Sequence, residues 1–505
     1  MSDDHGSPAG PDLTAGVSRD ALVDGKLVGH VGDEDVLVVR TQDGIFAIGA
    51  HCSHYHGPLA DGLVVGNSVR CPWHHACFDL RTGRVDRPPA LNDLDCWRVE
   101  EHDGRIFVRD KRPRWEPAAR ASAGTPERIV IVGGGAAGLS AASTLRRESY
   151  AGDIVMLSAE PNPPVDRPNL SKDYLAGSAP EDWLPLKPDE FYAEENITLR
   201  LDSEVSAVDV KDRCVRLAGG ETIPYDRLLL ATGAEPVKLS IPGAERRHVF
   251  TLRSLADSRA IIAAAGHARR VVVIGASFIG LEVAAALRTR GLEVHVVAPE
   301  RRPMERVLGA RIGDFVRNLH ETHGVVFHLE DTVTEIRDAD AVLKSGATLA
   351  ADLVVMGVGV RPRLGLAQAA GLSIDRGVMV DAYLETSVPG IFAAGDIARW
   401  PDPHSGENIR VEHWVVAERQ GQTAARNMIG LRERFDAVPF FWSQHYDVPI
   451  NYVGHAEAWD DIVVEGDIAA KDCLLRYQRA GRDLAVASIF RDVESLEAEV
   501  AMERQ

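Results

Sequence analysis

The sequence has few cysteines and no long apolar run, and both absences exclude whole classes of protein. Six cysteines occur in 505 residues and no two form a Cys-x-x-Cys pair, so neither a disulfide scaffold nor thioredoxin-type dithiol chemistry is expected. No uninterrupted apolar stretch of about 18 residues is present, which argues against a membrane-spanning helix. Residues 1–10 have neither the cationic start nor the apolar core of a signal peptide. The sequence therefore predicts a cytoplasmic protein.

The chain also lacks an excess of positive charge. It holds 56 Lys and Arg against 75 Asp and Glu, which gives a formal net charge of −19 at pH 7. Such a surface repels phosphate groups and releases no counterions from them, so we expect neither a nucleic-acid partner nor a membrane partner. A basic partner protein remains compatible with this charge. The length and the 45 % hydrophobic content are typical of a globular enzyme of about three domains.

The N-terminal part contains short β-segments with hairpin signals. Residues 36–40 and 45–48 flank the turn Gln42-Asp43-Gly44, which predicts a small all-β domain at residues 13–110. Residues 111–127 are rich in Arg, Pro, Ala, Ser and Gly and show no apolar period, which is typical of an interdomain linker.

Beyond the linker, one strand–glycine loop–helix unit occurs twice. A buried strand at 128–132 precedes a glycine loop and a helical pattern at 136–147, and the same order returns with a strand at 271–274 and a helix at 278–288. Such glycines allow a tight turn and let a helix N-terminus approach a pyrophosphate, although either loop alone is also compatible with a plain strand-to-helix turn. The glycines assigned to the two loops are Gly133, Gly135, Gly138, Gly275 and Gly280.

An acidic residue follows the second strand of each unit. Glu160 lies where a carboxylate accepts hydrogen bonds from ribose hydroxyls, and alignment of the strand ends places Glu300 opposite it. A second ribose-binding carboxylate favours NADH over NADPH. Arg301 and Arg302 offer the alternative of binding a 2′-phosphate. The middle glycine of the second loop is replaced by Ser277.

Four residues of the N-terminal domain form an iron–sulfur signature. Cys52 and His54 give C-x-H, and Cys71 and His74 give C-x-x-H after sixteen intervening residues. Two thiolates and two imidazoles on adjacent loops suit a [2Fe-2S] cluster of the Rieske type, and the segment resembles Rieske domains. The alternative is a structural zinc site on the same four residues, although their spacing is unusual for zinc. We interpret His56 and His75 as loop or surface histidines, and the other four cysteines as ordinary thiols.

The segment departs from high-potential Rieske proteins at four positions. The resemblance places the two cysteines of their disulfide at Gly57 and Trp73. It places the hydroxyl residues that donate to a cluster sulfur and to a ligand sulfur at Ala76 and Phe78. Because those hydrogen bonds stabilise the reduced cluster, we expect a low reduction potential.

Several further segments carry a resemblance to a flavoprotein family. YDRLLLATG at 225–233 and IFAAGD at 391–396 fit an FAD domain, and 166–172 (DRPNLSK), 411–414 (VEHW) and 439–443 (PFFWS) complete the set. With them the chain resembles the apoptosis-inducing-factor-like and ferredoxin-reductase flavoproteins, in the subgroup with an N-terminal Rieske domain. The cofactors implied are FAD, NADH and a [2Fe-2S] cluster.

The resemblance also implies roles for particular residues. Lys172 and Glu282 pair beside the flavin where hydride arrives, although two unrelated surface charges are the alternative, and Asp396 holds the ribityl chain. Trp414 and Trp442 line the flavin region unless they serve only core packing. The remaining cofactor-binding residues implied by the motifs are Arg167, Thr232, Gly233 and Gly395.

The sequence thus predicts a multi-domain protein: the all-β Rieske domain, two α/β dinucleotide-binding domains and a C-terminal α+β domain. The expected FAD domain covers 128–250 and 385–425, the NAD domain 251–384 and the C-terminal domain 426–505. The predicted activity passes electrons from NADH through FAD and the cluster to a one-electron acceptor protein, such as an oxygenase or a cytochrome P450. Alternatives are an NADH oxidase, a disulfide reductase, which the missing cysteine pair disfavours, and a redox-responsive interaction protein. A homodimer is compatible with the resemblance.

Overall fold

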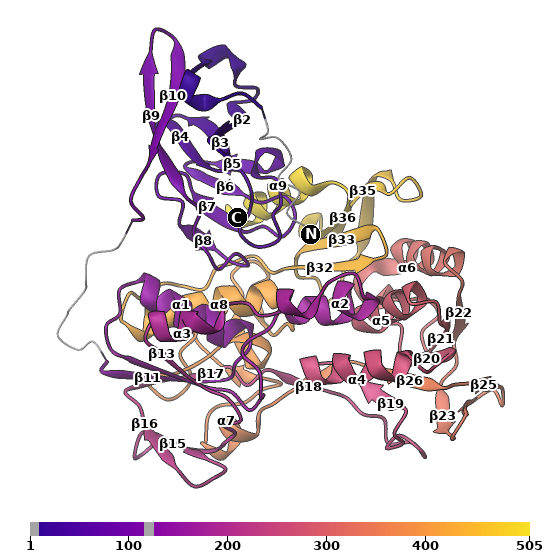
Figure 1. Ribbon diagram of the computed structural model, residues 1–505. Helices are drawn as coiled ribbons and strands as arrows, with labels where there is room; N and C mark the ends of the chain where they lie inside the picture. The colour runs from indigo at the N-terminus through magenta and orange to yellow at the C-terminus, as the bar shows by residue number, and fades with distance from the viewer. Residues whose placement is uncertain (1–9, 116–125) are drawn as a thin grey trace. The chain divides into compact units, whose positions relative to one another are not determined.

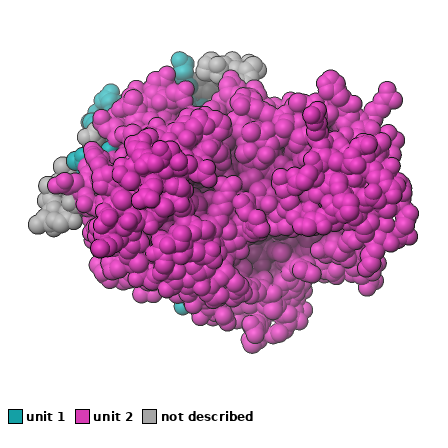
Figure 2. Space-filling model, turned by 90° about the horizontal axis from the view of Figure 1, so that it is seen from below, with its two compact units in different colours: residues 1–125, 143–151, 492–505 teal, residues 126–142, 152–491 magenta. Residues whose placement is uncertain are grey.

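The computed structural model describes residues 10–115 and 126–505 (Figure 1). The chain divides into two compact units, coloured in Figure 2: unit 1 holds residues 1–125, 143–151 and 492–505, and unit 2 holds residues 126–142 and 152–491. Of the expected linker at 111–127, residues 116–125 lie outside the described residues, as do residues 1–9 of the N-terminal segment. None of the helices in the described ranges is long and apolar enough to cross a membrane.

Unit 1 contains two antiparallel sheets. Strands of the first follow the order β1-β10-β9-β4-β3-β2, and β5 to β8 form the second in sequence order. Alternate side chains of β3 belong to different core clusters. Leu37 packs with Ile48 in one cluster, whereas Val38 lies in another. The strands are β1 Val17–Ser18, β2 Lys26–Val31, β3 Glu34–Thr41, β4 Gly44–Gly49, β5 Leu63–Val65, β6 Ser68–Arg70, β7 Cys77–Asp79, β8 Val85–Arg87, β9 Cys96–His102 and β10 Arg105–Lys111.

The first α/β sheet of unit 2 is parallel, in the order β13-β12-β11-β17-β29. Its central strand leads through the first glycine loop into helix α1 (Ala136–Arg147). Gly133 has a φ of +128°, and a Cβ there would lie 2.0 Å from the carbonyl oxygen of Ala231. Only glycine therefore fits this turn. The strands are β11 Arg128–Val132, β12 Asp153–Leu157, β13 Ile197–Arg200, β17 Arg227–Leu230 and β29 Ile391–Ala393.

The second α/β sheet repeats this arrangement in the order β19-β26-β20-β21-β22 and leads into α5 (Phe278–Thr289). Ser277, at the middle glycine position, caps this helix because its Oγ accepts a hydrogen bond from Gly280 N–H at 3.2 Å. The same hydroxyl donates to Gly357 O at 2.7 Å, so the serine that stands in place of the glycine stabilises the turn into α5. The strands are β19 Val249–Thr251, β20 Arg270–Ile274, β21 Glu293–Ala298, β22 Val325–Leu329 and β26 Leu353–Met356.

Unit 2 also contains an antiparallel five-stranded sheet in the order β32-β33-β36-β35-β34. This sheet belongs to the expected α+β domain at 426–505, but the last helix of that range, α9 (Asp492–Glu503), groups with unit 1. The strands are β32 Phe440–His445, β33 Val448–Gly454, β34 Asp461–Asp467, β35 Asp472–Arg479 and β36 Arg482–Ile489. Other helices that bear on the site are α2 Asp173–Ala176, α6 Glu305–Thr322, α8 Trp414–Met428 and the 3-10 helix η4 Arg167–Ser171.

Candidate functional site

A cavity of about 890 Å³ lies in unit 2 and is lined by both glycine-loop units together with β32 and α8. Most of the cofactor-binding residues expected from the sequence line it: Gly133, Gly135, Glu160, Arg167, Lys172, Thr232, Gly233, Glu282, Gly395, Asp396, Trp414 and Trp442. Gly138, Gly275, Gly280 and Glu300 lie outside the lining. The tertiary structure therefore brings together residues that are more than 300 positions apart in the sequence.

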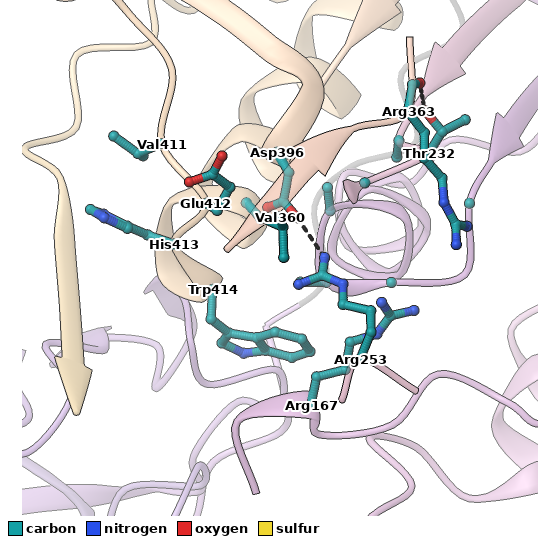
Figure 3. Close-up of a pocket in the computed structure, with 18 of the residues that line it drawn as sticks. Arg167, Thr232, Arg253, Val360, Arg363, Asp396, Val411, Glu412, His413 and Trp414 are labelled. Carbon is teal, nitrogen blue, oxygen red and sulfur yellow. Dashed lines mark hydrogen bonds and ion pairs between the residues drawn. The ribbon is translucent and has the colours of Figure 1, made fainter. Parts of the chain in front are cut away.

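Two arginines of the cavity lining each pair with a carboxylate. Arg167 pairs with Glu160 at 2.6 Å. Arg253 pairs with Asp396 at 2.5 Å, as the dashed line in Figure 3 marks. Burial, together with the neighbouring Arg253, lowers the pKa of Arg167. Arg253 Nε is buried and has no hydrogen-bond partner among the described residues. Two clustered guanidinium groups with an unused donor fit the diphosphate of a dinucleotide such as FAD.

The sequence did not single out Arg253. It lies between β19 and helix α4 (Leu255–Ala265), outside both glycine loops and every segment of the resemblance. His413, Glu412 and Arg363 also line the cavity without having been expected. His413 directly precedes Trp414 within the VEHW segment, so that motif already contained a signal for it.

Lys172 and Glu282 meet at the wall of the cavity, where Lys172 Nζ lies 3.0 Å from Glu282 Oε2. η4 ends next to the lysine, while α5 carries the glutamate, so the pair joins two segments of unit 2. Lys172 Nζ also lies 6.0 Å from the centre of the Trp442 ring. The geometry is that of an ion pair beside an aromatic wall, while a catalytic role for it remains a prediction.

The basic residues after β21 are not equally available to a nucleotide. Arg302 is held by Asp314 at 2.7 Å and by Glu305 at 3.1 Å. The hydrogen bond to Asp314 is the main reason that the pKa of Arg302 is raised. This guanidinium therefore already has two carboxylate partners, whereas Arg301 is exposed.

The four expected iron–sulfur ligands of unit 1 lie on two loops of the same shape. In the first, Cys52 N–H donates to Gly57 O at 2.9 Å and His56 N–H donates to Cys52 O at 3.0 Å. In the second, Cys71 N–H donates to Ala76 O at 2.8 Å and His75 N–H donates to Cys71 O at 3.2 Å. His56 and His75 both adopt the left-handed conformation, with φ of +58° and +61°. Each loop therefore presents one thiol and one imidazole from an equivalent turn.

The two loops bring their ligand atoms into contact. His54 Nδ1 lies 3.2 Å from His74 Nδ1, and both cysteines are buried. The thiols share a hydrogen bond that lowers the pKa of Cys71 and raises that of Cys52. Desolvation lowers the pKa of His54 to about 3, which keeps the imidazole neutral as metal ligation requires. Two thiols and two imidazoles fit a [2Fe-2S] cluster, in which Cys52 and Cys71 would hold one iron and the histidines the other.

The positions that differ from high-potential Rieske proteins surround these ligands. A Cβ at Gly57 would lie 2.8 Å from Cys71 Sγ and 3.2 Å from the Trp73 ring, so the loop has no room for a larger residue there. Trp73 is 41 % exposed, whereas Ala76 and Phe78 are completely buried. Both buried residues belong to the core cluster that contains the two ligand cysteines.

Helix α9 packs against the second ligand loop within unit 1. Glu499 accepts a hydrogen bond from His75 Nδ1 at 2.8 Å, and both side chains are completely buried. Ser495 Oγ lies 3.4 Å from the other ring nitrogen of His75, and Arg70 binds Glu503 at 2.7 Å. His75 is thus a loop histidine, as expected, but it lies in the interior and binds the end of the chain.

Comparisons with known proteins agree with this architecture. Residues 127–421 match the pyridine nucleotide-disulphide oxidoreductase family, residues 15–98 the Rieske [2Fe-2S] domain and residues 440–505 the reductase C-terminal domain. Human "Apoptosis-inducing factor 3" is 35 % identical over 92 % of this chain and 79 % of its own length. The "Anthranilate 1,2-dioxygenase system ferredoxin--NAD(+) reductase component" of Burkholderia cepacia is 39 % identical over 68 % of this chain and 85 % of its own.

A solved structure shows the same fold. The covalent putidaredoxin reductase–putidaredoxin complex superposes with a TM-score of 0.73 at 33 % identity, and covers 76 % of this chain and 94 % of its own. The fold and the cavity together define a two-dinucleotide flavoprotein with an iron–sulfur domain. The chain belongs to the pyridine nucleotide-disulphide oxidoreductase family. It is an FAD-dependent NAD(P)H oxidoreductase that carries a Rieske [2Fe-2S] domain, as predicted from its sequence.

Proposed function

We propose that this protein takes electrons from NADH, passes them through FAD to its own Rieske cluster, and delivers them singly to an acceptor protein such as an oxygenase or a cytochrome P450. The observation that carries the proposal is the presence in one chain of the arginine-lined dinucleotide cavity and of two matched Cys/His loops. Relatives named as reductases of a dioxygenase system and of putidaredoxin support the direction of electron flow.

The chain's own residues bind, orient and shield the cofactors in this proposal. Arg167 and Arg253 neutralise the diphosphate, and Asp396 accepts hydrogen bonds from the ribityl hydroxyls. Lys172, held by Glu282, would place a positive charge beside a ring system bound in the cavity. Bound FAD supplies the conversion of a two-electron hydride donor into a one-electron donor.

An anaerobic titration of the purified protein with NADH tests the proposal. Visible absorption follows the flavin and electron paramagnetic resonance follows the cluster. We expect both to be reduced, with the cluster signal appearing only when FAD is bound. A flavin that is reduced while the cluster stays oxidised would contradict the intramolecular transfer.

NADH is the proposed electron donor, because Glu300 aligns with Glu160 and a carboxylate repels a 2′-phosphate. Arg302 is already held by two carboxylates, which leaves Arg301 alone to attract that phosphate. We expect kcat/KM for NADH to exceed that for NADPH by at least about tenfold, or ~1.4 kcal/mol. Glu300→Ser should narrow the difference, with Glu293→Ser, on the strand that precedes Glu300, as the control. A higher kcat/KM with NADPH would overturn this assignment.

A second candidate function is that of a redox-responsive interaction protein, in which NADH binding changes assembly. The observation that favours it is the 35 % identity with human "Apoptosis-inducing factor 3" over 92 % of this chain. Turnover with a one-electron acceptor separates the two functions, since only the reductase sustains it.

Three further expectations from the sequence remain proposals. A homodimer is checked by analytical ultracentrifugation with and without NADH, and the cytoplasmic location is checked by cell fractionation. The domain limits also stay proposals: Rieske 13–110, FAD 128–250 and 385–425, NAD 251–384 and reductase C-terminal 426–505. Limited proteolysis would map them.

A further inference from the structure

A buried chain of polar side chains continues from Glu282 away from the cavity. Ser443 in β32 donates its hydroxyl proton to Glu282 Oε1 at 2.6 Å. His445, on the same face of β32, has its Nε2 3.2 Å from Ser443 Oγ. His320 in α6 has its Nε2 3.2 Å from His445 Nδ1. Ser443 is 1 % exposed and both histidines are completely buried, so water does not compete for these hydrogen bonds.

The donors and acceptors of this chain follow from the carboxylate at its end. A carboxylate only accepts, so the single proton of Ser443 points to Glu282, and Ser443 Oγ must accept from His445 Nε2–H. Burial lowers the pKa of His445 to about 3 and that of His320 well below its usual value. Each ring is therefore neutral with one N–H, which leaves His445 Nδ1 to accept from His320 Nε2–H. Every proton in the chain points towards Glu282.

The second oxygen of Glu282 is held from the other side. Ser171 Oγ–H donates to Oε2 at 2.5 Å, and Lys172 Nζ lies 3.0 Å from the same atom. Each carboxylate oxygen of Glu282 thus accepts a hydrogen bond from a serine hydroxyl, and Oε2 also pairs with the ammonium group of Lys172. Glu282 lies in α5, and its carboxylate is held by Ser171 of η4, by Lys172 directly after it and by Ser443 of β32. Helix α6 extends the chain through His320. A chain of this kind rigidifies the carboxylate at its inner end, while His320 Nδ1 at its outer end has no hydrogen-bond partner among the described residues.

We propose that Ser443, His445 and His320 are positioning residues for flavin reduction, because they hold the Glu282 carboxylate against Lys172 and so fix the ammonium group at the cavity wall. The inference rests on the proposed function, in which Lys172 and Glu282 act beside the flavin. None of the three residues touches the reacting atoms in this proposal. They act through Glu282 alone.

Ser443→Ala in the full-length holoprotein is the first test, since it removes the donor to Oε1. An unsatisfied buried acceptor is costly, so we expect the limiting rate of flavin reduction by NADH to fall about tenfold. FAD content and the NADH dissociation constant should not change. Stopped-flow absorption at the flavin band over a range of NADH concentrations measures the limiting rate and the NADH dissociation constant.

The matched control is Ser488→Ala. Ser488 lies in the same five-stranded sheet, is 1 % exposed, and its hydroxyl has no hydrogen-bond partner among the described residues. Its variant should reduce the flavin at the wild-type rate. If both serine variants slow equally, the effect comes from packing of the sheet and the proposal is wrong.

Substitution of His445 tests the chain one step further and remains informative if Ser443→Ala fails to fold. His445→Leu removes the donor to Ser443 and should slow flavin reduction, whereas His445→Gln keeps an amide N–H and should recover most of the rate. Equal rates in the two variants would contradict a hydrogen-bonding role.

A double-mutant cycle separates positioning from general destabilisation. Glu282→Gln removes the charge on which the chain acts, so adding Ser443→Ala to it should cause no further loss of rate. If instead the double variant loses rate by the product of the factors that the two single variants lose, the two residues act independently and the proposal is wrong. If the wild-type flavin is not reduced by NADH at all, the proposed function fails, whereas a normal wild type with an unaffected Ser443→Ala refutes only the positioning role.

Discussion

Replacement of His74 by alanine is expected to abolish the Rieske signal in electron paramagnetic resonance while FAD stays bound. The reason is that His74 lies in unit 1, on a loop between β6 and β7, whereas the cavity proposed to bind FAD lies in unit 2. Loss of one imidazole removes one of two protein ligands from one iron. His54→Ala should behave in the same way, since the two rings meet at 3.2 Å. NADH-to-ferricyanide activity should persist in both variants.

His56→Asn is the matched control for these substitutions. His56 lies in the same loop but is exposed, and asparagine tolerates its left-handed conformation. This variant should keep the cluster signal and full transfer of electrons to a one-electron acceptor protein. If His74→Ala also strips the flavin, unit 1 is required for the folding of unit 2, and the separation of the two functions is wrong.

The second large effect concerns the reduction potential of the cluster. The sequence resemblance aligns Ala76 and Phe78 with the hydroxyl donors of high-potential Rieske proteins, and the structure buries both side chains completely. The potential should therefore lie near the lower end of the Rieske range, about −150 mV and not about +300 mV. Protein-film voltammetry measures it directly. A value above about +150 mV would refute the link between these positions and the potential.

Phe78→Tyr should raise this potential, because a phenol at that position brings a hydroxyl donor into the core cluster that contains Cys52 and Cys71. Hydrogen bonds to sulfur favour the more negative, reduced cluster. Ala76→Ser tests the second missing donor and should act in the same direction. Phe46→Tyr is the control, since Phe46 packs only at the edge of this cluster. A potential unchanged by Phe78→Tyr would show that the phenol does not reach a sulfur.

A potential near the bottom of the Rieske range would suit electron flow from the flavin to a partner protein. A cluster near the bottom of the range still accepts electrons from NADH through the flavin, yet remains reducing enough to pass them to a partner. A cluster near the top would hold its electron. The buried Ala76 and Phe78 therefore suit the proposed role in transfer better than a role as final acceptor.

Local sequence determined the elements that depend on neighbouring residues. The predicted strand 128–132 and helix 136–147 are found as β11 and α1. The glycine loop between them imposes a turn, and the apolar residues follow a strand pattern before it and a helical pattern after it. The Rieske domain was also identified correctly, because the ligand spacing within each Cys/His loop is a local property. The assignment of individual cofactor-binding residues stays a prediction.

Other parts of the site depended on contacts between distant segments, which no local pattern encodes. Arg253 enters the cavity because β19 pairs with β26 in the second α/β sheet and so places the loop after it. Glu499 accepts a hydrogen bond from His75, which is 424 positions away in the sequence, and Glu282 accepts one from Ser443, which is 161 positions away. The sequence by itself determined the two glycine loops and the presence of the Rieske domain, because short-range sterics and local residue spacing fix them. Only the tertiary structure decided which buried polar groups satisfy one another, because that pairing follows from how distant segments pack together and exclude water.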